Sequence, residues 1–185
     1  MCWSRHGQSG RRRSVSSILA IDPGNEQSAW VLYADGSPKS FGKEDNADLL
    51  YLNYRVDPRG VAPRFPLAIE MIASYGMPVG AEVFETCVWI GRFIQAWGGP
   101  WSFVYRRDVK LHLCGSSRAK DGNVRQALLD RWGGKKAALG NKASPGPLFG
   151  FKADVWQALA VAVTYSDKLA AGTLGTQHTV PGVAQ

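Results

Sequence analysis

Short apolar runs bounded by turn residues dominate the first half of the chain. Residues 15–21 and 65–71 are nearly continuous apolar runs, which favours buried strands, and residues 29–34 form a similar run that ends at an Asp-Gly turn. Residues 39–43 could add an edge strand. Because the three runs nearest the start follow one another through short turns, the pattern predicts an antiparallel meander.

The second half of the chain changes to helical spacing. Residues 79–97 carry apolar side chains every three or four positions and end at Gly-Gly-Pro, and residues 152–171 repeat this spacing at Val155, Leu159 and Val163. The remaining segments are helices at residues 45–54, 107–113 and 122–132, a strand at residues 101–105, and loops at residues 55–64, 75–80 and 133–150. The last loop is rich in Gly, Lys and Pro, so we expect it to be mobile and basic.

This order of elements predicts one α/β domain over residues 16–171. The expected sheet is mixed, with three antiparallel strands first and parallel strands afterwards, and helices cover both faces. A chain of 185 residues suits one domain with a sizeable core. We expect a basic disordered tail at residues 1–15 and a loose tail at residues 172–185.

The composition favours a polyanion as the partner. The formal net charge is +7 at pH 7, which favours nucleic acid over an acidic membrane surface. No apolar run approaches the ~20 residues that a membrane span needs, so we expect no membrane partner. The three cysteines are scattered and form no CxxC pair, which argues against a disulfide framework or a zinc site. We therefore expect a protein of the reducing cytoplasm.

Three acids occupy positions where a carboxylate needs a partner. Asp22 follows the first apolar run, Glu70 lies near the end of another, and Asp154 lies in the first turn of the last expected helix. Strand ends and a helix start can meet at one edge of an α/β sheet, where such folds place their sites. The alternative is three unrelated acids: a turn aspartate, an edge glutamate and an aspartate stabilised by the helix dipole.

If the three acids meet, a divalent cation would relieve their mutual repulsion. Ligands that are all oxygen suit Mg²⁺ or Mn²⁺. Two such ions roughly 3.5–4 Å apart are the usual apparatus for cutting a phosphodiester, because one activates water while the other stabilises the leaving oxygen. In a basic protein, such a cluster of acids indicates a nuclease.

Four short motifs resemble the RuvC family of Holliday junction resolvases and, more narrowly, the RuvC-like nucleases of bacteriophages. They are LAIDPG at residues 19–24, LAIE at residues 67–70, DVK at residues 108–110 with Gly115 behind it, and ADVWQALAVAV at residues 153–163. Their order extends the resemblance from about residue 16 to residue 171. It implies an RNase H-like fold and a homodimeric, Mg²⁺-dependent endonuclease that cuts paired strands of four-way DNA junctions symmetrically.

The resemblance also implies roles for individual residues. Asp22, Glu70 and Asp154 match the catalytic acids that bind the metal, and Lys110 matches a basic residue that contacts the scissile phosphate. Gln157 stands where the family commonly has a second aspartate in the final helix. An amide is a weaker ligand than a carboxylate and cannot act as a base. This difference therefore bears on whether a second metal ion binds and on whether DNA is cleaved at the full rate.

Basic residues cluster in one third of the chain and could form a face that follows DNA phosphates, although a solvated surface is the alternative. The candidate DNA-binding residues are Arg106, Arg107, Lys110, Arg118, Lys120, Arg125, Tyr75 and Met77. Lys120 lies near the position of a later family lysine. Tyr75 and Met77 belong to a loop in the region of the family's junction-opening wedge, where they could stack on unpaired bases. The alternative is an ordinary Gly/Pro loop.

Two further patterns concern the core and the assembly. Most tryptophans lie in apolar segments, so we interpret them as core residues rather than platforms for DNA bases. Residues 79–97 are apolar on more than one face, so this helix either lies in the core or also forms the seam of a homodimer.

The leading hypothesis is a structure-specific endonuclease that resolves four-way junctions in branched DNA with Mg²⁺ as its cofactor. It would act in the cytoplasm of a bacterial host if a phage encodes it. One alternative is a broader nuclease for branched, forked or flapped DNA. Another is a junction-binding protein with weakened catalysis, which is the alternative that Gln157 suggests.

Overall fold

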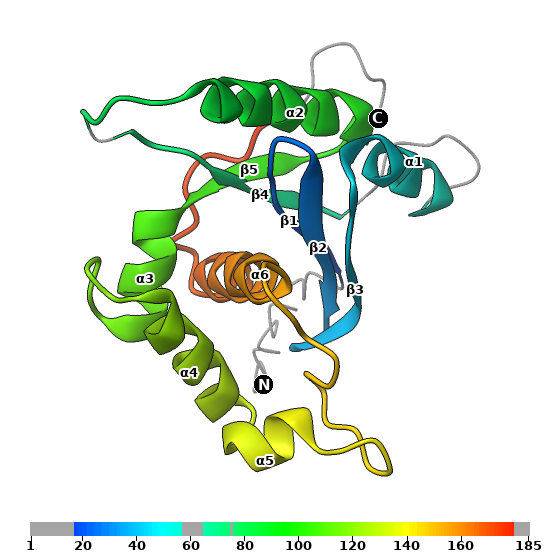
Figure 1. Ribbon diagram of the computed structural model, residues 1–185, viewed down its shortest axis with the longest axis vertical. Helices are drawn as coiled ribbons and strands as arrows, with labels where there is room; N and C mark the ends of the chain where they lie inside the picture. Colours follow the sequence, from blue (N-terminus) through cyan, green and yellow to red (C-terminus); the bar gives the residue numbers. More distant parts are fainter. Residues whose placement is uncertain (1–16, 57–64, 75, 180–185) are drawn as a thin grey trace, which may run out of the picture.

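A five-stranded mixed sheet forms the centre of the protein (Figure 1). The computed structural model describes residues 17–56, 65–74 and 76–179. The strands are β1 (Ile18–Asp22), β2 (Gln27–Ala34), β3 (Ser37–Asp45), β4 (Leu67–Met71) and β5 (Trp101–Tyr105), in the sheet order β3-β2-β1-β4-β5. β1, β2 and β3 are antiparallel neighbours, and β4 runs parallel to both β1 and β5.

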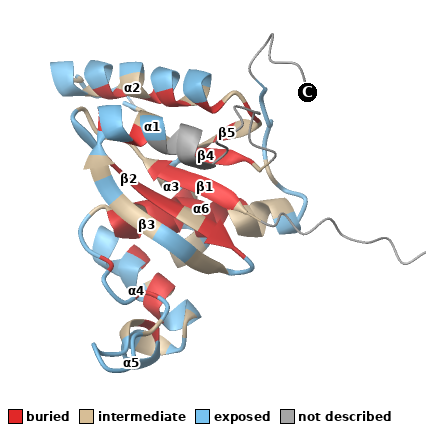
Figure 2. Ribbon diagram, turned by 90° about the vertical axis from the view of Figure 1, so that its right-hand side faces the viewer, coloured by how far each residue is buried: buried red, intermediate tan, exposed pale blue. Residues whose placement is uncertain are grey.

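Helices cover both faces of this sheet. They are α1 (Asn46–Val56), α2 (Ala81–Trp97), α3 (Arg106–Cys114), α4 (Asp121–Arg131), α5 (Gly134–Leu139) and α6 (Val155–Ala170). Helices α1 and α2 lie on one face of the sheet and α6 lies on the other. Figure 2 shows α2 and α1 together on one side of the buried strands. Helices α3 and α4 pack beside α6, and α5 continues from α4 away from the sheet (Figure 1).

Alternation along the strands divides the core into two layers, because successive side chains of a strand point to opposite faces. Ile18 and Ala20 of β1 pack with the residues of α6, whereas Leu19 and Ile21 pack with α1 and α2. Helix α6 is buried along most of residues 155–165, since the sheet covers one side of it and α3 and α4 cover another. This burial explains why its sequence is apolar on nearly every face.

The fold class expected from the sequence is confirmed. The antiparallel strands come first, the parallel strands follow, and helices lie on both faces. The edge strand β3 is longer than residues 39–43. The expected tail at residues 1–15 and the beginning of the first strand at residue 15 lie outside the described residues.

The expectation of a loop over residues 133–150 is wrong in part, because its first third is helical and two of its residues join the core. This segment contains helix α5 and an antiparallel bridge between Gly140 and Pro145, and Ala138 and Leu148 are fully buried against the core beside α6. The amide of Leu148 donates to the carbonyl of Ala138 at 2.8 Å, which ties the two ends of the segment together. The small residues that made the segment look like a loop are there because its backbone packs closely on itself.

The residues that follow α6 return to the free edge of β5. Trp101 and His178 exchange two backbone hydrogen bonds of 2.9 and 2.8 Å, and their rings stack with centroids 4.5 Å apart. The side chain of Gln177 donates to the hydroxyl of Tyr165 at 2.6 Å. Residues 176–178 of the expected loose tail thus contact β5 and α6, and residues 180–185 lie outside the described part. Within the described residues, no helix combines the length and the apolar character needed to cross a membrane.

Candidate active site

A row of paired positions crosses the sheet and brings charged residues together. Lys43 of β3 pairs with Ala29 of β2, and Ala29 pairs with Asp22 of β1. The parallel register of β1 and β4 places Glu70 one residue beyond the last β1–β4 pair, level with Asp22. Residues in one row point to the same face of a sheet, and here that face is the one covered by α6.

A buried network of hydrogen bonds holds the turn that follows Asp22. The amide of Gly24 donates to Ser28 Oγ at 3.2 Å, Ser28 Oγ donates to Asn46 Oδ1 at 2.6 Å, and Asn46 Nδ2 donates to the carbonyl of Gly24 at 2.9 Å. Ser28 and Asn46 are almost fully buried. The turn is closed so tightly that a Cβ on Gly24 would collide with the carbonyl oxygen of Gln27. The backbone that carries Asp22 is therefore fixed on both sides.

Glu70 lies beside a guanidinium at the end of β5. Arg106 opens helix α3, and its Nη1 lies 3.5 Å from Glu70 Oε2 while its Nη2 lies 2.8 Å from Asp121 Oδ1. Lys110, one helical turn further along α3, lies 3.8 Å from the same oxygen of Asp121. The helices α3 and α4 thus meet through one acid and two cations, next to the carboxylate of Glu70.

Asp154 reaches the site from the other side, as the residue that precedes α6. Its carboxylate does not cap the helix but lies 2.7 Å from the ammonium of Lys43. The turn that delivers it is tight, since Ala153 has a φ of 38°. Both side chains of this ion pair are about half exposed, at 40% for Lys43 and 50% for Asp154, so they form the open side of the site.

The two inner carboxyl groups, those of Asp22 and Glu70, affect each other's protonation. Burial and the charges of Glu70 and Asp154 together raise the pKa of Asp22 to about 8, against the lowering effect of Arg106 and Lys43. Burial likewise raises the pKa of Glu70, against the lowering effect of Arg106. The carboxyl groups of Asp22 and Glu70 are close enough to share a hydrogen bond. A pair of this kind must share a proton or gain a cation at neutral pH.

The donor atoms at this place fit a hard divalent cation. Asp22 and Glu70 offer carboxylate oxygens on rigid strands, which is the chemistry that Mg²⁺ and Mn²⁺ prefer. Among the described residues, no group of three or more histidine, cysteine, aspartate or glutamate side chains lies close enough together to hold a metal ion. Gln157, one turn beyond Asp154, has a buried Oε1 atom with no hydrogen-bond partner in the described part of the chain.

The structure brings some of the residues singled out in the sequence together and leaves others apart. Asp22 and Glu70 meet, and Asp154 lies across from them beside Lys43. Arg106, expected on a DNA-binding surface, lies inside the site against Glu70. Lys110 reaches Asp121 rather than the strand carboxylates.

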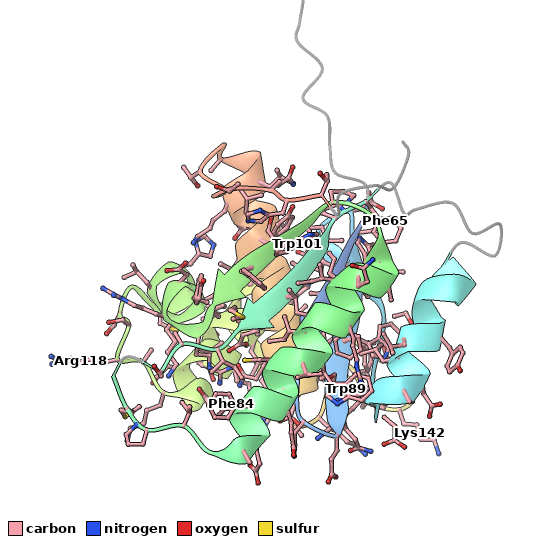
Figure 3. The ribbon with its side chains drawn as sticks, turned by 90° about the horizontal axis from the view of Figure 1, so that it is seen from above. Phe65, Phe84, Trp89, Trp101, Arg118 and Lys142 are labelled. Carbon is pink, nitrogen blue, oxygen red and sulfur yellow. The ribbon has the colours of Figure 1, made fainter. Side chains whose placement is uncertain are left out.

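The other candidate DNA-binding residues lie around this centre. Arg107, Arg118 and Lys120 are exposed, and Figure 3 shows Arg118 at the outer edge of the molecule. Arg125 lies over the ring of Trp156 at 4.8 Å from its centroid, within the distance of about 6 Å at which a cation is attracted to a ring face. Met77 is 69% exposed, and Tyr75 lies outside the described residues.

Sequence reasoning missed Lys43, Ser28 and Asn46. Each reaches the site from β2, β3 or the start of α1, so its relevance depends on how those elements pair with β1. A weak signal was present for Asn46, since asparagine is a common residue at a helix start. Lys43 carried no signal that distinguishes it from any lysine of an edge strand.

Comparison with known proteins identifies the fold. No family model and no curated protein matches the sequence. Two solved structures of RuvC from Thermus thermophilus are similar, one of them in complex with a Holliday junction substrate. The first has a TM-score of 0.61 and the complex 0.64, each at 18% sequence identity over 85% of this chain and 97% of the other. The chain therefore has the RNase H-like fold seen in RuvC.

Proposed function

We propose that the protein is a structure-specific endodeoxyribonuclease that resolves four-way DNA junctions with the help of a divalent metal ion. The observation that carries the proposal is the buried carboxyl pair of Asp22 and Glu70, held at the ends of two parallel strands and open on the side of Asp154. Such a pair has no evident structural purpose, because burial of two acids side by side destabilises the fold. In an RNase H-like fold, this is the position at which a catalytic acid pair would stand.

Mg²⁺ is the expected cofactor and Mn²⁺ would substitute for it. Asp22 and Glu70 would hold the ion, and Asp154 would complete the acidic set from the opposite side. When bound, a divalent ion neutralises phosphate charge and lowers the pKa of water. The chain's own residues fix the acids: the Gly24–Ser28–Asn46 network orients Asp22, and Arg106 favours the ionised form of Glu70 against the effect of its burial.

The reaction is hydrolysis of a phosphodiester. The oxygen of a water molecule attacks phosphorus, the bond from phosphorus to one ester oxygen breaks, and a water proton ends on the departing oxygen. One strand end then carries a phosphate and the other a hydroxyl. Lys110 would contact the scissile phosphate, which requires it to exchange its 3.8 Å contact with Asp121 for the substrate.

The segment from residue 118 to residue 152, which lies beside the site, is rich in basic residues and supports binding of a branched polyanion. Between residues 118 and 152 the acids are Asp121 and Asp130, whereas the basic residues are Arg118, Lys120, Arg125, Arg131, Lys135, Lys136, Lys142 and Lys152. Helices α4 and α5, which extend away from the sheet, carry half of these basic residues (Figure 1). Arg106 and Arg107 begin the same face nearer the acids. Tyr75 and Met77 would contact unpaired bases at the branch point.

The exposed side of α2 supports a homodimer. Phe84 is 61% and Val88 54% exposed, and Gly91 and Gln95 continue the same stripe at helical spacing. Figure 3 shows Phe84 beside α2, near the beginning of the helix. A two-fold protein would suit a junction whose two cuts are related by symmetry. The bacteriophage-type RuvC-like nucleases are the group that we infer for it, acting in the bacterial cytoplasm.

The experiment is a cleavage assay with labelled four-way junction, three-way fork and linear duplex, in Mg²⁺ and in EDTA. Wild-type protein should place symmetric nicks in the four-way junction when Mg²⁺ is present, and Asp22→Asn should abolish them. Equal cutting of all branched forms would instead establish a broader debranching nuclease. Binding without cutting would establish a junction-binding protein, an outcome that Gln157 in place of an acid makes worth testing.

A further inference from the structure

We propose that Lys43 acts as a fixed cation in place of a second metal ion, contacting the scissile phosphate from the edge strand while a single divalent ion binds at Asp22 and Glu70. This inference rests on the proposed nuclease function and assigns a residue and a metal stoichiometry to it.

The position of Lys43 follows from the strand register. Lys43, Ala29 and Asp22 occupy one row on the α6 face, and Ala29 presents only a methyl group between the two charged side chains. Since neighbouring strands lie ~4.8 Å apart, Lys43 starts two strand spacings from Asp22 and reaches back over the small side chain. Its ammonium ends 2.7 Å from Asp154, beside the carboxyl pair whose protonation it influences.

The contact with Asp154 differs from an ordinary surface ion pair. An aspartate directly before a helix commonly accepts a hydrogen bond from the helix amides, but the side chain of Asp154 makes no such bond. It is directed to Lys43 instead. By contrast, Lys39 on the same strand forms a looser 3.7 Å pair with Asp35 at the hairpin, where both side chains are more exposed. Asp154 therefore holds the lysine in a defined place.

The charges around Asp154 leave little to bind a second divalent ion. The next residue on the same face of α6 is Gln157, whose amide is neutral, and the single charge of Asp154 is matched by Lys43. The described residues also contain no cluster of three acidic or other metal-binding side chains. Two close divalent ions need several carboxylates to offset their repulsion, whereas one ion needs only the inner pair.

The chemistry of an ammonium suits this role. Lysine carries a compact charge with three donors, of which Asp154 engages one, so two remain for phosphate oxygens. Lys43 is 40% exposed on the open side of the site, where a DNA backbone would approach. Its ammonium group would then stabilise the negative charge that develops on phosphate oxygens during hydrolysis.

The test counts metal ions. Mn²⁺ binding to the full-length protein is measured by electron paramagnetic resonance at pH 8 for the wild type, Lys43→Met/Gln157→Asp and Lys39→Met. We expect one ion per chain for the wild type and for the Lys39 control, and two ions for the double variant, which exchanges a cation for a carboxylate. Two ions on the wild type, or one on the double variant, would overturn the inference while leaving the nuclease proposal intact. An absence of Mn²⁺ binding would overturn both.

A second arm measures the rate of a single turnover on pre-bound junction at saturating Mg²⁺. Lys43→Met should slow cleavage about 100-fold, the usual effect of removing one donor to a developing oxyanion. Lys43→Arg should restore most of the rate, and Lys39→Met should cut at the wild-type rate. A Lys43→Met protein that cuts as fast as the wild type would show that the lysine merely pairs with Asp154.

Discussion

The guanidinium of Arg106 lies 3.5 Å from the carboxylate of Glu70, so one of the two buried acids already has a cation beside it. Arg106 also lowers the pKa of Asp22 through its charge, without touching it. It is anchored from behind by Asp121 at 2.8 Å. In the metal-free site, burial therefore favours the protonated forms of the two acids, whereas Arg106 favours their ionised forms.

Removal of Arg106 is expected to move metal binding to higher pH. In Arg106→Met the acids lose the charge that lowers their pKa, so protons compete with the metal over a wider range. The midpoint of the pH dependence of Mn²⁺ binding should rise by about one unit or more, as for other acids that lose an adjacent arginine. The measurement is Mn²⁺ titration between pH 5 and 9. Arg107→Met is the control, because Arg107 is an exposed neighbour; an unchanged midpoint in Arg106→Met would contradict this account.

Asp22 should make the metal-free protein less stable as pH rises. The unfolded chain loses this proton near pH 4, whereas the folded chain holds it up to about pH 8. Between these values the folded state binds more protons, so the free energy of unfolding falls with rising pH, by at most about 1.4 kcal/mol per pH unit. Urea denaturation in EDTA from pH 5 to 8 should show this slope, and Asp22→Asn should flatten it. Mg²⁺ should restore stability at pH 8; a slope that is the same in both proteins would refute the assignment.

The strands of the sheet and the meeting of Asp22 with Glu70 could be predicted from the sequence alone. Apolar runs gave the strands, and the parallel alignment expected for β1 and β4 brings Asp22 and Glu70 together, because both residues end runs of similar length. Asp154 was found for a related reason, since the start of a buried helix is easy to place from its spacing. These features depend on local pattern, which the sequence displays directly.

The place of Lys43 in the site could not be predicted from the sequence, because it depends on the pairing register of β2 and β3. The hairpin pairs Ala34 with Ser37, and counting back from that turn would pair Ala29 with Gly42 and direct Lys43 to the opposite face. An irregularity between Leu32 and Tyr33 shifts the register by one residue and turns Lys43 toward α6. A one-residue slip reverses every side chain of a strand, and a bulge is not visible in the hydrophobic pattern.

The composition of residues 133–150 favoured a loop, and part of this segment is instead a helix. Gly, Lys and Pro made the segment resemble a loop, yet α5 begins there and Leu148 is fully buried. Close packing of backbone against backbone requires small residues as much as a loop does. The contacts that decide between the two are distant in sequence and could not be inferred from it.

Asn46 should prove necessary for holding Asp22 in place. Asn46→Ala removes an acceptor from Ser28 and a donor from the carbonyl of Gly24 in a buried setting, which should destabilise the fold by about 2 kcal/mol. Because Gly24 lies two residues beyond Asp22, Mn²⁺ affinity should fall as well, even at temperatures where the variant is fully folded. Differential scanning calorimetry measures the loss of stability, and titration calorimetry on the folded protein measures the Mn²⁺ affinity.

The matched control for Asn46 is Asn123→Ala. Asn123 accepts a hydrogen bond from the amide of Lys120 at the start of α4, and it is exposed. This variant should lose some stability, as a lost helix cap does, and keep the Mn²⁺ affinity of the wild type. Equal losses of Mn²⁺ affinity in both variants would mean that Asn46 acts through stability alone.

Gly91 provides a direct test of the dimer expected on α2. Gly91 is exposed in the middle of the stripe that contains Phe84 and Val88, and a Cβ added to it would meet no atom within 4 Å. Gly91→Leu should therefore leave the folded protomer intact, and replacing a mid-helix glycine should stabilise α2 by a few tenths of a kcal/mol up to about 1 kcal/mol. If two copies of α2 cross at this glycine, the new side chain must separate them.

Light scattering after size exclusion distinguishes these outcomes, because one chain has a mass of 20.1 kDa and a dimer has twice that mass. Wild-type protein should elute as a dimer and Gly91→Leu as a monomer with an equal or higher melting temperature. Ala96→Leu adds a comparable side chain to an exposed position on another side of α2 and should remain dimeric. On junction DNA, the monomeric variant should nick single strands without the paired cut, because the second active site is no longer held in register. A Gly91→Leu protein that remains dimeric would place the two-fold contact elsewhere on the surface.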